Sequence, residues 1–138
     1  MVFISLIPNI IPLLLTGAIM GIFGIALKPS TILVFSIAFG ISIDDTIHFL
    51  AKYRQELKSK TISSAVEISI KETGISMIYT SIILFFGFSI FTASEFGGTQ
   101  ALGILVSLTL FVAMLTNLIL LPSLLLSLEK LSLIHISE

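Results

Sequence analysis

The stretch TILVFSIAFGISIDDTIHFLAKY, residues 31–53, carries two adjacent carboxylates and an imidazole inside an otherwise apolar run. A helix needs about 20 mostly apolar residues to cross the roughly 30 Å hydrocarbon core of a membrane, so this run is long enough. Asp44 lies about 13 residues into it, which at 1.5 Å per residue is about 20 Å along the helix. We therefore expect acids at a depth where one charge costs about 2.5 to 3.5 kcal/mol.

The composition of the whole chain is typical of a membrane protein. Its 138 residues are 56% hydrophobic and only 11% charged, whereas soluble domains have roughly 25% charged residues. The mean hydropathy is +1.16. The net charge is -1 without a long basic tract, so nothing indicates a nucleic-acid partner. The chain has no cysteine, which excludes disulfides, thiol catalysis and cysteine-bound zinc.

Four segments are predicted to span the membrane, giving an all-α, polytopic membrane helical bundle. The first is expected to begin near or after Pro8, because proline is tolerated in a first helical turn but not deep inside a helix. The second follows a tight connection with Ser30 as a plausible N-cap, and Pro122 is expected in the last turn of the fourth. The predicted spans are residues 9–27, 31–53, 73–94 and 101–126.

A short amphipathic helix is predicted between the second and third spans, over about residues 61–71. Ile62, Val66 and Ile70 recur every four residues, and Ser64 and Glu67 have the spacing of a capping box. Such a helix lies in the membrane interface. The predicted membrane domain therefore covers residues 1–130. The tail LSLIHISE, residues 131–138, fits poorly with the preceding sequence, resembles a translated sequencing adapter, and is given no functional weight, His135 included.

The distribution of basic residues predicts the orientation of the chain. Of the seven Lys and Arg, five lie between the second and third predicted spans: Lys52, Arg54, Lys58, Lys60 and Lys71. They are read as topogenic charges, and by the positive-inside rule their loop is cytoplasmic. We expect a multi-pass protein of the cell (inner) membrane with both chain ends in the cytoplasm.

The acids share one face of their helix with small and polar residues. Intervals of four place Ser36, Gly40, Asp44, His48 and Lys52 on one ladder, with Asp45 about 100° further round. The opposite half is apolar and comprises Phe35, Phe39, Ile43, Ile47, Phe49 and Leu50. We expect the polar half to face a polar interior. Small residues would let a neighbouring helix approach closely, and they are Ser36 and Gly40 near the acids, Gly17, Gly21 and Gly24 in the first span, and Gly103 and Ser107 in the fourth.

This polar stripe is suited to handling protons. Adjacent carboxylates removed from water resist simultaneous ionisation, so Asp44 and Asp45 should titrate as a coupled pair. His48, one turn away, would offer a second exchangeable site on the same face. A buried ion pair is a less favoured role for the acids, because no other span carries Lys or Arg at depth. For His48, a bond to a backbone carbonyl remains an equal alternative.

Enzymatic alternatives fit the sequence poorly. An intramembrane aspartyl protease needs acids on two facing helices, whereas Asp44 and Asp45 lie on one. Two carboxylates and one His are too few ligands for zinc or a di-metal centre. No Ser-His-Asp set or phosphate-binding glycine loop is visible. We expect no catalytic residues, no cofactor and no metal.

Two long runs resemble the resistance-nodulation-division (RND) superfamily, in particular its MMPL-type exporters. They are LIPNIIPLLLTGAIMGIFGIALKPSTILVFSIAFGISIDDTIHFLAKYRQEL, residues 6–57, and ETGISMIYTSIILFFGFSIFTASEFGGTQALGILVSLTLFVAMLTNLILLPSLLL, residues 72–126. The resemblance implies an exporter driven by the proton-motive force and built from two six-helix halves. This chain would be a fragment holding the third to sixth helices of one half, the C-terminal one. Asp44 and Asp45 would then carry the proton relay, with His48 as a flanking member.

The same resemblance implies the partners and leaves two alternatives open. The implied partners are membrane lipid, protons and the missing half of the transporter, in a homo-oligomer, with a lipid or other hydrophobic molecule as substrate. The first alternative is a sterol-sensing-like module that binds lipid or a partner without pumping. The second is a protein-export accessory subunit, which His48 and the exit sequence YRQE at residues 53–56 fit less well.

Overall fold

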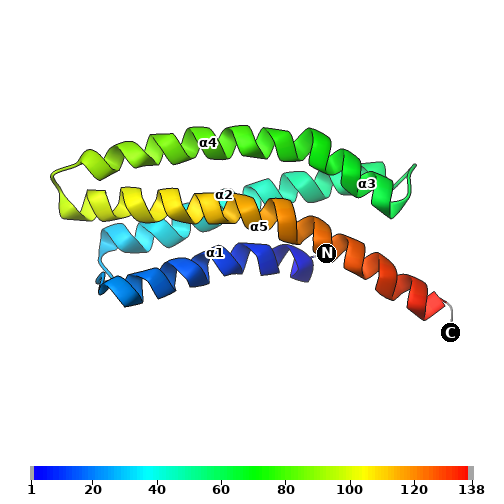
Figure 1. The fold of residues 1–138 in the computed structure, drawn as a ribbon, viewed down its shortest axis with the longest axis horizontal. Coiled ribbons are helices and arrows are strands. Elements are labelled where there is room, and N and C mark those ends of the chain that lie inside the picture. The colour runs from blue at the N-terminus through cyan, green and yellow to red at the C-terminus, as the bar shows by residue number, and fades with distance from the viewer. Residues whose placement is uncertain (1, 137–138) are drawn as a thin grey trace.

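The structure, a computed structural model, describes residues 2–136 of the chain, and side chains for residues 3–131. Four helical runs alternate in direction along the bundle (Figure 1). They are α1 (Val2–Phe23), α2 (Pro29–Glu56), a continuous third run, and α5 (Gly97–Ile136). The third run comprises α3 (Ile62–Ser69), the π-helix η1 (Ile70–Gly74), α4 (Ile75–Ser89) and the 3-10 helix η2 (Ile90–Ala93). The all-α prediction is confirmed for the described part of the chain.

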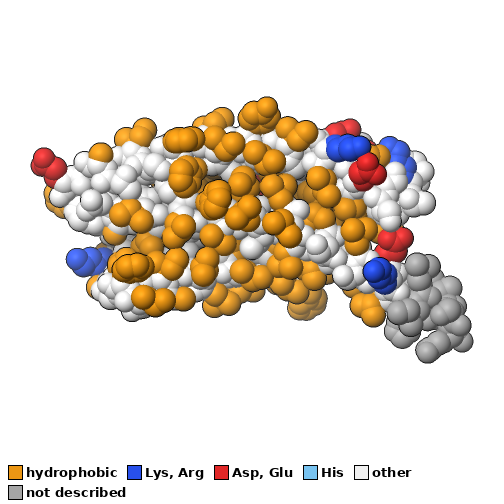
Figure 2. Space-filling view, in the orientation of Figure 1, with side chains coloured by type: hydrophobic (Ala, Val, Ile, Leu, Met, Phe, Trp, Pro, Cys, Tyr) orange, Lys and Arg blue, Asp and Glu red, His pale blue; other side chains and the backbone are white. Residues whose placement is uncertain are grey.

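All four runs are long and apolar enough to cross a membrane, over Phe3–Phe23, Pro29–Glu56, Ile62–Ala93 and Gly97–Leu131. The visible face is apolar across its middle, and charged side chains gather at the two ends (Figure 2). Large apolar residues such as Phe3, Ile22 and Ile83 point out of the bundle, which is stable only where lipid surrounds them. The chain is therefore a multi-pass membrane protein. We call the end formed by residues 52–72, which holds the five clustered basic residues, the basic end.

The first helix begins at Val2, before the predicted start near or after Pro8, and both prolines are buried inside α1. Pro12 has no N–H, so the carbonyl of Pro8 loses its partner within the helix. The hydroxyl of Thr116 on α5 donates a hydrogen bond to that carbonyl at 3.0 Å. A hydroxyl from a neighbouring helix is one means by which spanning helices tolerate proline. The helix is thus continuous because of a contact with a residue 108 positions away.

Gly24 ends α1 in the left-handed conformation, with φ of 66°. The N–H of Ile25 donates to the carbonyl of Met20 at 2.8 Å, as in a Schellman motif. The next helix begins one residue before the predicted N-cap, Ser30, which lies inside the first turn. Pro29 occupies the first helical position, where its missing N–H costs nothing. The Lys28 N–H instead donates to Oγ1 of Thr31 at 2.7 Å.

Helix α5 is the centre of the bundle and contacts α1, α2 and α4. The predicted close approach at Gly103 and Ser107 is present: a Cβ at Gly103 would lie 2.8 Å from the carbonyl oxygen of Phe88. Ser107 donates to the carbonyl of Phe85 at 3.3 Å and accepts from Ser89 at 3.3 Å. No described atom of another helix lies within 4 Å of a Cβ built at Gly17, Gly21 or Gly24. No described helix therefore packs closely against these glycines of the first span.

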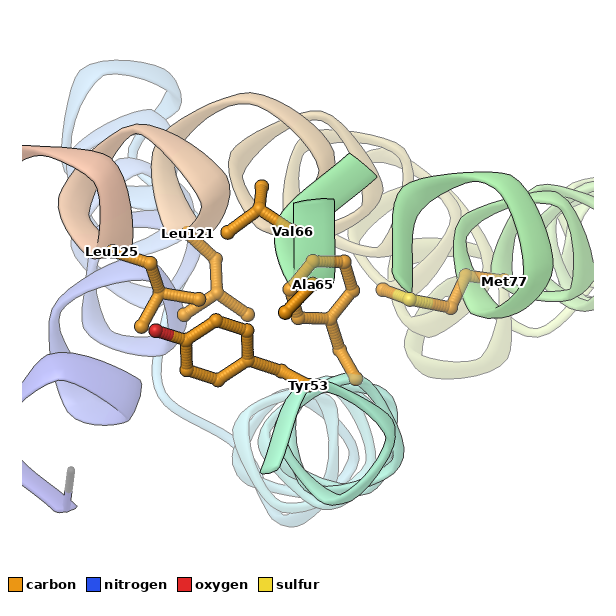
Figure 3. Close-up of a cluster of buried hydrophobic side chains, with 7 residues drawn as sticks. Tyr53, Ala65, Val66, Met77, Leu121 and Leu125 are labelled. Atoms are coloured by element: carbon orange, nitrogen blue, oxygen red, sulfur yellow. The ribbon is translucent and has the colours of Figure 1, made fainter. Parts of the chain in front are cut away.

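The segment predicted as a short separate helix is helical as α3, but it continues through η1 into α4 without a break and so forms the start of the third run. Its N-cap is Thr61, whose side chain accepts from the Ser64 N–H, and not the predicted Ser64. Its Ala65 and Val66 pack with Tyr53 and Leu121 in a buried apolar cluster at the basic end (Figure 3). The cluster comprises Phe49, Tyr53, Ala65, Val66, Met77, Leu121 and Leu125. A second cluster toward the opposite end contains Met20, Val34, Leu105, Val106 and Leu110. Helix α5 continues past Pro122 into the tail, where side chains from residue 132 on, His135 included, lie outside those described.

Candidate functional site

Asp44, Asp45 and His48 all line one cleft beside α2. Nε2 of His48 lies 3.6 Å from Oδ1 of Asp44, one helical turn away. The side chains of Asp44 and His48 are 72% and 68% exposed, whereas Asp45 is partly buried. The structure therefore brings the three predicted relay residues together on one wall. Their role in proton transfer stays a prediction.

The opposite wall of the cleft comes from the third helical run and was not predicted. Glu72 and Thr73 of η1 and Ser76, Met77 and Thr80 of α4 line it, and the cleft has a volume of about 410 Å³. Four of these five side chains are polar. A spacing of four residues from Glu72 to Ser76 to Thr80 is visible in the sequence and is the signal that would have indicated this wall.

The π turn decides which side chains of the third run face the cleft. The buried stripe of this run passes through Ser69, Gly74, Met77 and Ser81. Its step of five residues from Ser69 to Gly74 spans the wide π turn, whereas a regular helix steps by three or four. In a regular helix the buried stripe would instead continue through residues 72, 73, 76 and 80. The extra residue thus rotates those four polar side chains out of the core.

An ion-pair network joins the two walls at the basic end. Nζ of Lys52 lies 2.7 Å from Oε2 of Glu72 and 2.8 Å from Oε1 of Glu56. Lys60 contacts the other oxygen of Glu56 at 2.7 Å. Lys52 and Lys60, which the sequence pattern predicts to be topogenic charges, therefore also form ion pairs within the protein. The Lys52–Glu72 contact ties η1 to α2 beside the cleft.

Behind the acids, α2 is held by a buried polar cluster that we call the amide node: Asn9 of α1, Ser42 and Thr46 of α2, and Asn117 of α5. All four are at most 2% exposed. Nδ2 of Asn9 donates to Thr46 at 3.0 Å, and Thr46 Oγ1 lies 3.1 Å from Oδ1 of Asn117. Ser42 donates to Oδ1 of Asn9, and Nδ2 of Asn117 donates to the Ser42 carbonyl at 3.3 Å. Sequence reasoning missed this node, although an isolated Asn in an apolar span is a signal for it.

Replacing Thr46 by valine should destabilise the protein by about 1 to 2 kcal/mol, because it removes a hydroxyl that bonds Asn9 and Asn117 in a buried site. The change keeps the shape of the side chain, so packing is preserved. The free energy of unfolding in mixed detergent micelles measures the loss. Thr80→Val is the matched control, since the Thr80 hydroxyl is exposed and bonds only the Ser76 carbonyl at 3.0 Å. Equal losses in both variants would contradict a role for the node.

The buried face of α2 differs from the predicted polar interior. It is a stripe formed by Thr31, Val34, Ala38, Ser42, Thr46, Phe49 and Tyr53. Ser36 and Gly40 are exposed, and no described atom lies within 4 Å of a Cβ built at Gly40. Within the described part of the chain, no helix therefore makes the close approach expected above the acids. The polar side of α2 faces away from the buried core of the bundle, and the cleft lies along one edge of it.

The cleft offers oxygen and nitrogen atoms for protons and water, and no clustered metal ligands. Within the described residues, no three or more His, Asp or Glu side chains are grouped closely enough to hold a metal ion. The residues that line the cleft include no Lys or Arg. Every buried side-chain N or O atom of the described chain has a hydrogen-bond partner. Among the titratable residues that line the cleft, Asp44 and Asp45 lie deepest in a spanning helix.

Fold and site define a polytopic membrane protein with paired acids on a spanning helix. The sequence pattern of the MMPL family matches residues 2–134. The chain belongs to the MMPL family. It is also 30% identical over 126 residues to the Methanocaldococcus jannaschii protein named "Putative membrane protein MJ1562"; the match covers 91% of this chain and 32% of that protein. No solved structure matches the chain.

Proposed function

We propose that this chain carries the proton relay of a membrane exporter driven by the proton-motive force. The observation that supports the proposal most strongly is the pair Asp44 and Asp45 on a spanning helix, facing a polar cleft whose described lining holds no Lys or Arg. A carboxylate at such depth is costly when charged and unpaired. Proton uptake removes that cost, and proton release into the cleft restores the charge.

The surroundings suit a group that changes its charge. The amide node holds the opposite face of α2 to α1 and α5, so α2 stays in place when an acid gains or loses a proton. The third run meets α2 at the basic end through α3 and η1. We infer that a change of charge on Asp45 alters how α4 lies beside α2. By the positive-inside rule, the basic end is in the cytoplasm.

A proton gradient imposed on proteoliposomes that contain the intact protein tests the proposal. Each proton moved down a gradient of about one pH unit supplies about 1.4 kcal/mol, enough for roughly tenfold accumulation of a substrate. We expect gradient-dependent movement of a fluorescent phospholipid or a hydrophobic dye, and its loss when a protonophore collapses the gradient. Probe binding or movement that the protonophore leaves unchanged would contradict the proposal and favour a lipid-binding module that does not pump.

A further inference from the structure

We propose that the cleft between α2 and the η1–α4 run is the path by which protons pass between the basic end and the Asp pair, with Glu72 as the exchanging group at its mouth. The inference rests on the proposed relay and adds its route. Polar side chains at intervals of four line both walls, Asp44 and His48 on α2 and the set Thr80, Ser76 and Glu72 opposite. Lys52 lies one turn beyond His48, outside the lining, where it pairs with Glu72 at the basic end. Both series run from the depth of the acids to the basic end.

The cleft has room for the water that would carry a proton. A cavity holds a water molecule for each 30 Å³ or so and needs polar partners, so about 410 Å³ accommodates on the order of ten waters. Hydroxyls of Thr73, Ser76 and Thr80 supply such partners along the η1–α4 wall. The π turn is what aims them there, because a regular helix would bury the same positions. π turns occur frequently at functional sites.

Glu72 is the acid at the mouth of the cleft, where solvent reaches its side chain. Its side chain is 61% exposed and has one described cation partner, Lys52, which it shares with Glu56. Glu56 contacts both Lys52 and Lys60 and is only 13% exposed, so it stays ionised when Glu72 takes up a proton. The neighbouring Lys71 pairs instead with Glu67 at 2.8 Å. The other titratable groups on the cleft lining are Asp44, Asp45 and His48.

The step is a transfer of one proton between oxygen atoms. An O–H bond of the Asp45 carboxyl breaks, the proton passes along ordered water, and an O–H bond forms on the Glu72 carboxylate. Glu72 then releases the proton to bulk water and pairs again with Lys52. Transfer in the reverse direction follows the same groups. No oxidant, reductant or other reactant takes part.

Cysteine labelling tests the route without relying on transport. Residues 1–138 contain no cysteine, so in an intact protein otherwise free of cysteine a single introduced thiol is the only reactive one. A charged, membrane-impermeant methanethiosulfonate applied from the basic end should modify Ser76→Cys and Thr80→Cys. Ile83→Cys is the control at similar depth, because Ile83 is 70% exposed on α4 and does not line the cleft. Labelling of Thr80→Cys no faster than that of Ile83→Cys would overturn the route.

Charge removal at the mouth tests Glu72 itself. Glu72→Gln should slow gradient-driven export by about tenfold, which is less than the roughly 10²-fold to 10⁴-fold that groups in direct proton transfer typically contribute, and Glu72→Asp should restore part of the rate. Glu67→Gln is the matched control, since Glu67 is 66% exposed and pairs only with Lys71. A full export rate in Glu72→Gln would overturn its role. If Asp44→Asn and Asp45→Asn also export normally, the relay itself fails; if those two variants are inactive, only the route is wrong.

Discussion

Replacing Asp45 by asparagine should stop proton-driven export by the intact protein while leaving its insertion in the membrane unchanged. Asparagine has nearly the same shape as aspartate but cannot exchange a proton near neutral pH. Groups that transfer protons typically contribute about 10²-fold to 10⁴-fold to a rate, so we expect a loss of at least about a hundredfold. Asp45 is chosen because it is partly buried beside the amide node residue Thr46, whereas Asp44 is exposed. Export in proteoliposomes under an imposed pH gradient measures the effect.

The matching controls separate loss of the relay from loss of the fold. Membrane expression and the free energy of unfolding should be unchanged or slightly improved in Asp45→Asn, because a costly charge is removed from a spanning helix. Asp44→Asn should also stop export, since the proposed relay uses both adjacent acids of the cleft. Gradient-dependent export at the normal rate in both variants would refute the relay. An inactive but unfolded variant would be recognised by its unfolding curve.

The parts of this structure that the sequence predicts are those set by local pattern. Long apolar runs predict the four spanning helices, because crossing a bilayer requires length and hydropathy and little else. The spacing from Asp44 to His48 predicts their common face, because helical geometry is the same wherever the helix lies. In the structure the two side chains approach to 3.6 Å, which one helical turn of separation allows. These inferences need no knowledge of the neighbouring helices.

The parts that the sequence does not predict depend on contacts between distant residues. Pro12 is accommodated within α1 because the hydroxyl of Thr116 donates to the Pro8 carbonyl in place of the N–H that Pro12 lacks. Asn9 and Asn117 reach Thr46 and Ser42 only after α1 and α5 have packed against α2. A single polar residue in an apolar span indicates that a polar partner exists, but the local sequence does not show which distant residue that partner is.

The second wall of the cleft was missed for a related reason. A regular helix over residues 62–93 places the positions of Glu72, Ser76 and Thr80 in the core, and the one-residue shift at η1 changes that assignment. The shift accompanies a tight contact in which a Cβ at Gly74 would lie 3.2 Å from Cδ2 of Leu118 on α5. Packing of the third run on α5 therefore decides which of its residues face the acids.

Replacing Gly103 by leucine should give the largest loss of stability among the substitutions considered. A Cβ there would lie 2.8 Å from the carbonyl oxygen of Phe88 and 2.8 Å from Cβ of Phe91, so backbone must move. Overpacking typically costs about 1 to 3 kcal/mol and occasionally more, and we expect about 3 kcal/mol or more here because the obstruction includes backbone. The contact of Ser107 with the Phe85 carbonyl should be lost as α4 moves away from α5. Unfolding in mixed detergent micelles measures the change.

Gly87→Leu is the control for the Gly103 variant. It makes the same chemical change within α4, but no described atom lies within 4 Å of a Cβ at that position, so we expect no loss, or a gain of less than about 1 kcal/mol from the better helix propensity of leucine. Equal losses at both glycines would contradict the close α4–α5 contact.

The milder variant Gly103→Ala tests whether this contact affects the cleft, because α4 carries Ser76 and Thr80 on one side and packs against α5 on the other. If α5 holds α4 at the correct distance from α2, Gly103→Ala should change the labelling rate of Thr80→Cys, whereas Gly87→Ala should leave it unchanged.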